Sequence, residues 1–180
     1  MKRICLLLLA LCLLLCGCGG RNEEQRFRAF SEALRGRDTL GFTAELLAKY
    51  PEKNVRMTLR YSLRDGVQRV AVLEPALIAG IGASVREGET QLEYDGVILD
   101  TGPLDVYGLS PLSALPILAD ALRNGFPASC WEEDGQSVMS LIRDDRYTVE
   151  VWFDSDMRPV HAELLSAGAV SVVCEIKDWS

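Results

Sequence analysis

Strict alternation of apolar and polar residues is the feature that most constrains how this chain can fold. It is clearest between residues 55 and 64, where every apolar residue is followed by arginine, threonine or serine. A period of two places the apolar side chains on one face of a β-strand and the polar ones on the other. The apolar set is Val55, Met57, Leu59, Tyr61 and Leu63. The pattern predicts a strand with one face turned toward a core.

Similar runs recur along the chain, separated by turn signals such as Asp65-Gly66, Asp95-Gly96 and Asp134-Gly135. Glycine supplies the positive φ that tight hairpins require. The runs predict about eleven strands, at residues 40–48, 55–63, 67–73, 81–86, 91–94, 97–100, 128–132, 137–143, 147–153, 160–165 and 170–177. The connections are too short for crossovers, so neighbouring strands should pair antiparallel, and a sheet of this size tends to curl.

Two segments have helical periodicity instead. The apolar residues between 27 and 34 predict an amphipathic helix, and those between 110 and 123 predict a second one, with Ser110-Pro111 as N-cap and first turn. Pro116 leaves two possibilities, because proline disrupts a helix interior but not its first turn. Either this helix is kinked, or it begins at Ser113. The two helices are the candidates to cover the apolar face of the sheet.

The N-terminus predicts export. Lys2 and Arg3 precede an unbroken apolar run over residues 4–15. This order is typical of a secretory signal peptide, which we expect to occupy residues 1–17. The run has about 12 residues, whereas a helix that crosses the bilayer needs ~20.

The end of this run, Leu15-Cys16-Gly17-Cys18, resembles the lipobox of bacterial lipoproteins. The resemblance implies cleavage before Cys18 and a lipid on its sulfur, with residues 18–22 as a polar tether. Cys16 is the rival acceptor, but it follows the bulky Leu15, where cleavage needs a small residue. An ordinary cleaved signal would instead leave Cys18 as a free thiol. We expect an exported protein anchored to the outer face of the cytoplasmic membrane.

Composition restricts the function classes of the mature chain. Removing residues 1–17 takes away two basic residues, so the net charge of −7 becomes −9, and no block of lysine or arginine remains. An acidic chain without such a block argues against nucleic acid as a partner. Cys130 and Cys174 are the cysteines left for the folded part. Alternation along the strands places the two side chains on opposite faces of the sheet, so we expect no disulfide between them. The alternative, a Cys130–Cys174 disulfide, stays open because exported proteins often contain disulfides.

The sequence contains no assembled catalytic or metal-binding motif. His161 is the single histidine, lies near Glu163 on a polar strand face, and has no nucleophile motif around it. Asp154-Ser155-Asp156 lacks the regularly spaced oxygen ligands of a calcium loop and fits an Asx-type turn. We therefore expect neither an enzyme nor a metal or cofactor.

Several turn signals together resemble the LolA/LolB-like superfamily. They are the lipobox, Leu73-Glu74-Pro75, Gly80-Ile81, Tyr94-Asp95-Gly96, Leu109-Ser110-Pro111 and Phe153-Asp154 followed by Pro159. The nearest members are the monoderm lipoproteins that include the spore germination lipoprotein GerS. The resemblance covers residues 23–179, and we expect the domain to occupy residues 23–180. It implies a mainly β, α+β fold: a curved, half-open antiparallel barrel with two covering helices. It also implies that the fold holds acyl chains between sheet and helices or binds protein partners.

These observations favour a non-catalytic binding module for a hydrophobic ligand, an acyl chain or a lipoprotein. An alternative is a GerS-like lipoprotein that holds or regulates an envelope enzyme, and an envelope hydrolase has the least support. Whether the apolar interior is a packed core or a ligand cavity is left open by the sequence. The candidate lining residues are Met57, Leu59, Tyr61, Leu115, Leu118 and Val151.

The lipid anchor can be tested directly. Cys18→Ala removes the predicted acceptor, so the protein should move from the membrane fraction to the soluble fraction, because one apolar run alone is too short to anchor it. Fractionation followed by immunoblotting measures this, with Cys16→Ala as the matched control. A Cys18→Ala protein that stays firmly on the membrane would contradict the assignment.

Overall fold

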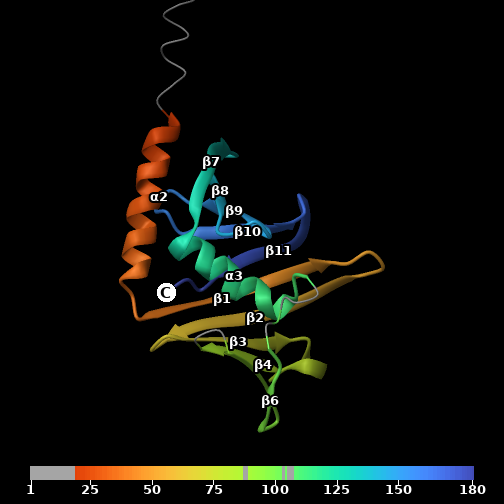
Figure 1. Cartoon of the computed structure of the whole chain (residues 1–180). Helices are drawn as coiled ribbons and strands as arrows, with labels where there is room; N and C mark the ends of the chain where they lie inside the picture. Colours follow the sequence, from red (N-terminus) through yellow and green to blue (C-terminus); the bar gives the residue numbers. More distant parts are fainter. Residues whose placement is uncertain (1–18, 87–88, 103, 105–107) are drawn as a thin grey trace, which may run out of the picture.

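Eleven strands form one antiparallel sheet, as the alternating pattern predicts (Figure 1). The computed structural model describes residues 19–86, 89–102, 104 and 108–180, so the predicted signal peptide and Cys18 lie outside the described residues. The strands are β1 (Thr39–Lys49), β2 (Asn54–Arg64), β3 (Val67–Glu74), β4 (Gly82–Arg86), β5 (Glu89–Tyr94), β6 (Val97–Asp100), β7 (Phe126–Glu133), β8 (Gln136–Ile142), β9 (Tyr147–Phe153), β10 (Pro159–Ser166) and β11 (Ala169–Lys177).

The order of the strands shows how the two halves of the chain meet. It runs β6-β5-β4-β3-β2-β1-β11-β10-β9-β8-β7, so each half is a meander and the pairing of β1 with β11 joins them. The tight turns follow the Asp-Gly signals. Asp65 and Gly66, for example, have φ of 51° and 74°. Positive φ at both central residues matches the right-handed twist of the flanking strands, so these turns set the hairpin register.

The first helix, α2 (Gly19–Arg35), begins earlier than expected. Residues 19–22, expected to form a polar tether, belong to its first turns. The described part of the predicted tether is therefore regular helix.

A short 3₁₀ helix, η1 (Ala76–Ile78), occupies the apolar link after β3.

The second helix, α3 (Pro111–Asn124), settles the question raised by Pro116. Ser110 caps it: its Oγ accepts from the backbone N–H of Ser113, and the Ser113 side chain accepts from the N–H of Ser110. This reciprocal box satisfies two donors that a helix start leaves unpaired. The alternative start at Ser113 is therefore wrong, and Pro116 lies inside the helix.

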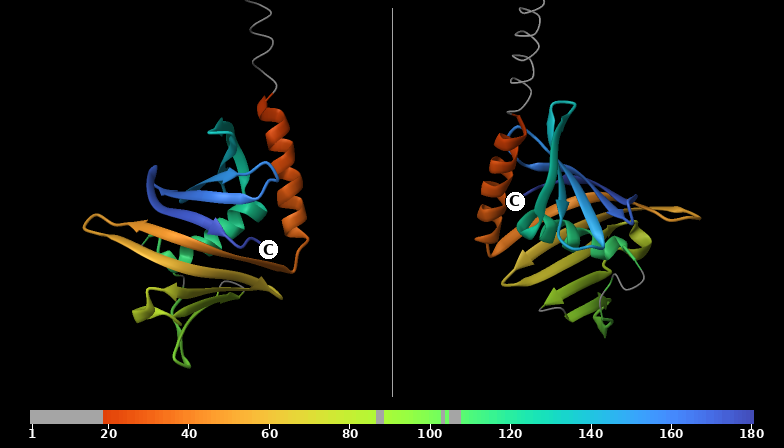
Figure 2. Two further views of the ribbon diagram at one scale, coloured as in Figure 1. Left: turned by 180° about the vertical axis from the view of Figure 1, so that it is seen from behind. Right: turned by 45° about the horizontal axis from the view of Figure 1, so that its top comes forward.

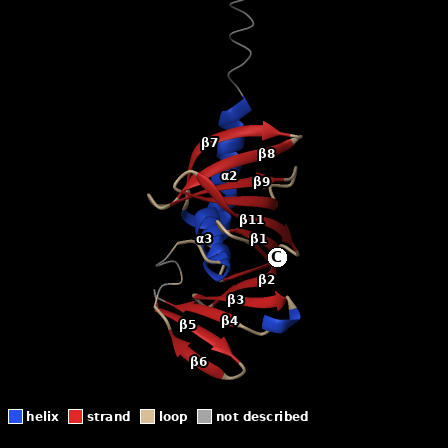
Figure 3. Cartoon of the chain, turned by 90° about the vertical axis from the view of Figure 1, so that its right-hand side faces the viewer, coloured by secondary structure: helices blue, strands red, loops and turns tan. Residues whose placement is uncertain are grey.

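The sheet curls around α3 (Figures 2 and 3), which defines an inner face toward the helix and an outer face away from it. Leu115, Leu118 and Leu122 of α3 are fully buried against the inner face. The predicted inward residues Val149 and Val151 also lie in this core. Residues at alternate positions of the same strands, such as Glu150, face outward and stay partly exposed.

Helix α2 is fastened to the rest by a cluster of aromatic rings. Phe27 and Phe30 place their ring centroids 6.0 and 5.5 Å from that of Phe153, and Phe30 also lies against Trp179. Ser31 donates a hydrogen bond of 2.7 Å to the carbonyl of Arg123 at the end of α3. Edge-to-face ring pairs stabilise beyond their buried area. Sheet and both helices thus share one core.

Truncating Leu118 should destabilise this core. Its side chain is 0% exposed between α3 and the sheet, so Leu118→Ala should lower the free energy of unfolding by about 2–5 kcal/mol, because it removes apolar contacts and leaves a cavity. Urea denaturation measures the change. Leu77→Ala, at a side chain 89% exposed, is the control and should have almost no effect. Equal effects of the two substitutions would contradict the assigned core.

Candidate functional site

Five of the six residues predicted to line a cavity lie in the packed core. Leu59, Leu115, Leu118 and Val151 are 0% exposed, and Tyr61 is 1% exposed. The Tyr61 hydroxyl donates a hydrogen bond of 3.1 Å to Gln68 Oε1, and burial raises the pKa of this phenol well above its ordinary value. The structure brings these residues together, as expected, but around one another and not around an open space. Their role in ligand binding stays a prediction.

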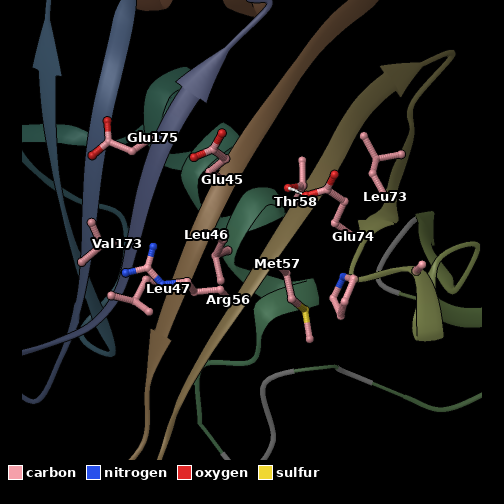
Figure 4. A pocket seen from close by; sticks show the side chains of 12 residues that line it. Glu45, Leu46, Leu47, Arg56, Met57, Thr58, Leu73, Glu74, Val173 and Glu175 are labelled. Carbon is pink, nitrogen blue, oxygen red and sulfur yellow. Dashed lines mark hydrogen bonds between the residues drawn. The ribbon is translucent and has the colours of Figure 1, made fainter.

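Met57, the sixth residue, is only partly buried and lines a groove of about 840 Å³ (Figure 4). The groove crosses strands β11, β1, β2 and β3, and its size lies in the range of small-molecule sites. Its apolar lining includes Leu46, Leu47, Leu73 and Val173. Polar residues share it, so the groove is amphipathic and differs from the apolar interior cavity that was one of the two possibilities left open by the sequence.

The polar side of this groove carries several carboxylates. Glu45 and Glu175 are cross-strand partners on β1 and β11, and Glu74 accepts a 3.1 Å hydrogen bond from Thr58. Two like charges at opposite positions repel each other. Lys177 lies beside them and donates a hydrogen bond to Glu45, which raises the pKa of the Lys177 ammonium group. The carboxylates are thus partly neutralised within the outer face itself.

A second cleft, of about 440 Å³, lies on the outer face around His161. His161 Nδ1 is 2.8 Å from Glu175 Oε1, its Nε2 is 3.9 Å from Glu163, and its ring meets Trp152 edge-on at 4.8 Å. The sequence indicated Glu163 but missed Glu175, because that contact depends on the pairing of β10 with β11. A histidine bonded to a carboxylate can act as a general base. The described residues that line this cleft include no serine, threonine or cysteine to serve as its nucleophile.

The carboxylates around this cleft continue a stripe across the outer face. Glu163 stands opposite Glu150 on β9, and Glu133 accepts hydrogen bonds from the indole N–H groups of Trp131 and Trp152 at 3.4 and 3.2 Å. Burial raises the pKa of Glu150, and the charges of Glu163 and Glu133 raise it further. Together with Glu45 and Glu175 these residues form what we call the acidic stripe.

Both cysteines are free, but for a different reason from the predicted one. Cys130 lies opposite the buried Met139 on the inner face, the same face as the buried Cys174. The expectation that the two sulfurs point to opposite faces is wrong. They are kept apart because β7 and β11 are four strand spacings, about 19 Å, from each other. Burial raises the pKa of the Cys174 thiol to about 12.

Two other possibilities concern metals and membrane spans. Within the part of the chain that the structure describes, no three histidine, cysteine or acidic side chains are grouped so that they could hold a metal ion. No described helix combines the length and apolar character needed to cross a bilayer. The expected lipid on Cys18 lies outside the described residues and stays a prediction.

The architecture is similar to that of several solved structures. The LolA superfamily protein NE2245 from Nitrosomonas europaea has a TM-score of 0.52 and 17% identity, over 87% of this chain and 91% of the other. A DUF1329 family protein from Desulfovibrio piger has a TM-score of 0.50 and 11% identity, over 88% and 90%. A chain from the complex of the CwlD amidase with the GerS lipoprotein, from Clostridioides difficile, has a TM-score of 0.42 and 14% identity, over 87% and 94%. No family model and no curated protein matches the sequence.

The chain has a LolA-like fold. The predicted fold class, a mainly β antiparallel sheet of eleven strands with two helices, is therefore confirmed. Likeness at this identity establishes the fold alone. The finer resemblance to the GerS-like members stays a prediction.

The buried phenol of Tyr61 should make stability depend on alkaline pH. Its raised pKa keeps the folded state protonated where the unfolded tyrosine, with a pKa of ~10, ionises. The stabilisation is complete below that pH and is lost as pH rises above it. Tyr61→Phe should cost about 1 kcal/mol at neutral pH, from the lost hydrogen bond to Gln68, but should flatten the fall above pH ~10.

Denaturant unfolding at a series of pH values measures this difference. Tyr94→Phe, at a ring 52% exposed, is the matched control and should keep the slope of the parent protein. An unchanged alkaline slope in Tyr61→Phe would show that the Tyr61 phenol ionises in the folded state.

Proposed function

We propose that this chain is an exported lipoprotein, held on the outer face of the cytoplasmic membrane through a lipid on Cys18, whose folded part binds another protein of the cell envelope without catalysis. The observation that carries the proposal is the filled space between sheet and helices, where the candidate lining residues Leu59, Leu115, Leu118 and Val151 are 0% exposed. An interior of this kind leaves the outer face as the place for recognition.

The outer face has the properties that a partner surface needs. It carries an amphipathic groove of about 840 Å³ beside a charged surface. Apolar side chains such as Leu47 and Val173 lie there between charged ones, as at interfaces that must stay soluble without a partner. A catalytic role has less support, since the described lining of the His161 cleft offers a carboxylate partner but no serine, threonine or cysteine to act as a nucleophile.

A hydrophobic ligand is the second candidate, and the groove around Met57 supports it. The flexible thioether and the neighbouring Leu73 can adapt to an acyl chain. Native mass spectrometry of the protein extracted from membranes would detect a non-covalent lipid. Met57→Asp should then remove it, and an unchanged lipid content in that variant would exclude the groove.

Site-specific photocross-linking in intact cells tests the main proposal. A photoreactive residue at Leu47, in the outer groove, should give a discrete adduct with one envelope protein, because that face is in contact with the partner. The same residue at Ala33, on the exposed side of α2, is the control and should give none. Absence of any adduct from Leu47, or identical adducts from both positions, would count against a partner on the outer face.

A further inference from the structure

Four arginines gather on the outer face of strands β2, β3 and β4, although no basic block exists in the sequence. They are Arg60, Arg64, Arg69 and Arg86, here called the arginine face. Arg69 has the central position, because it pairs with Ser62 while Arg60 and Arg64 lie two residues to either side on β2. On its other side it pairs with Ser84, two residues from Arg86. Diagonal neighbours across strands are about 7–8 Å apart.

The arginine face forms no ion pair with a carboxylate among the described residues, although Glu89 on β5 stands opposite Arg86. None of its four side chains makes a hydrogen bond or an ion pair with them, and all four are exposed. The acidic stripe is different, because three of its carboxylates have partners within the chain: Lys177 bonds Glu45, His161 bonds Glu175, and two indole N–H groups bond Glu133. Among the described residues, the arginine face is therefore a cluster of positive charge that no ion pair neutralises.

The arginines border a cleft of about 640 Å³. Arg64, Arg69 and Arg86 line it together with Ser62, and Asp65 is the one acidic side chain among its described lining residues. Four like charges at this spacing repel one another, which destabilises the bare sheet. Small serines at Ser62 and Ser84 beside Arg69 leave room for a group to approach. An anion in the cleft would relieve the repulsion and accept paired hydrogen bonds from the planar guanidinium forks.

We propose that the arginine face docks an extended acidic segment of the protein partner, with aspartate or glutamate at alternate positions. Alternate side chains of an extended segment are about 6.8 Å apart, which matches the diagonal spacing of the arginines. Carboxylates at this period could meet Arg60, Arg69 and Arg64 in turn. This inference rests on the proposed partner-binding function and gives the chemistry of the contact.

The position of the arginine face favours a protein segment over anionic lipid. The cleft includes Thr39, which follows the C-terminal end of α2, whereas the predicted lipid anchor precedes the N-terminal end (Figure 1). The 17 residues of α2 separate the two by about 25 Å. Electrostatic attraction is screened within ~8 Å at physiological ionic strength. A bilayer surface also cannot enter a cleft as an extended chain can.

The test uses the full-length protein in neutral detergent and a short fluorescent peptide that alternates aspartate with serine. Fluorescence anisotropy should show binding that weakens as salt is added, and a peptide with asparagine in place of aspartate should not bind. Arg69→Gln should weaken binding at least about tenfold, because it removes charge-assisted hydrogen bonds. Arg158→Gln, at an exposed arginine in the turn before β10, is the matched control and should bind as the parent does.

Stability gives a second readout that a structural role for Arg69 would not produce. If the arginines repel one another, Arg69→Gln should keep or raise the thermal midpoint at low salt while peptide binding falls. A lowered midpoint together with unchanged binding would overturn the proposal. So would equal affinity for the aspartate and asparagine peptides.

Two further measurements distinguish the acidic segment from other possible occupants of the arginine face. Stronger binding to phosphatidylglycerol vesicles than to the acidic peptide would assign the face to lipid, and dimerisation that Arg69→Gln abolishes would assign it to a second copy. In the cross-linking experiment at Leu47, a partner captured equally by Arg69→Gln and the parent would refute this inference and leave the proposed function standing. Binding of the acidic peptide without any adduct from Leu47 would support the arginine face as a site for acidic segments but count against the proposed partner on the outer groove.

Discussion

The pairing of β1 with β11 is the contact on which the rest of the structure depends. Every other strand pairs with neighbours in sequence, so without this one ladder the chain would form two separate meanders. It runs from Thr43 to Ala48 on one strand and from Val172 to Lys177 on the other, and the mutual backbone hydrogen bonds of Gly41 and Ser180 extend it. Two short meanders would each expose an edge and an apolar face. The joined sheet buries the inner-face apolar residues of both meanders in one core with α2 and α3.

The local parts of the fold could be predicted because each has a local cause. Alternation fixes which side chains point inward, and Asp65-Gly66 sets a hairpin because its two residues adopt positive φ. The β1–β11 ladder has no such signal, since it joins segments more than a hundred residues apart and many strands could pair in register. For this reason the sequence indicated Glu163 near His161 but not Glu175, which the ladder beside β10 brings there.

At the edge of the sheet, in β7, the polarity of the side chains does not distinguish the inner face from the outer face. Cys130 was expected on the solvent side because it shares a strand face with Glu132, yet that face is covered by the polar first turns of α2. There, Glu23 accepts a hydrogen bond of 2.7 Å from Ser137, and this bond lowers the pKa of Glu23. A bulge between Pro127 and Ser129 further breaks the parity of β7. Patterns of alternation therefore assign faces reliably only where a strand borders the apolar core.

The same reasoning explains why the functional surface was harder to foresee than the fold. Periodicity gives the direction of a side chain but not the distance to what it faces, so a packed core and a cavity have the same pattern. The arginine face was hidden for a related reason: Arg60, Arg64 and Arg69 occupy ordinary polar positions of alternating strands, and the sheet alone places them around one cleft. Because α2 is regular helix from Gly19 and is held to Phe153 by Phe27 and Phe30, a lipid at Cys18 would orient the whole sheet and not a loosely tethered domain. An anchor at one end of α2 and, at the other, a cluster of arginines that no described residue neutralises would then present positive charge away from the bilayer, toward proteins of the envelope space.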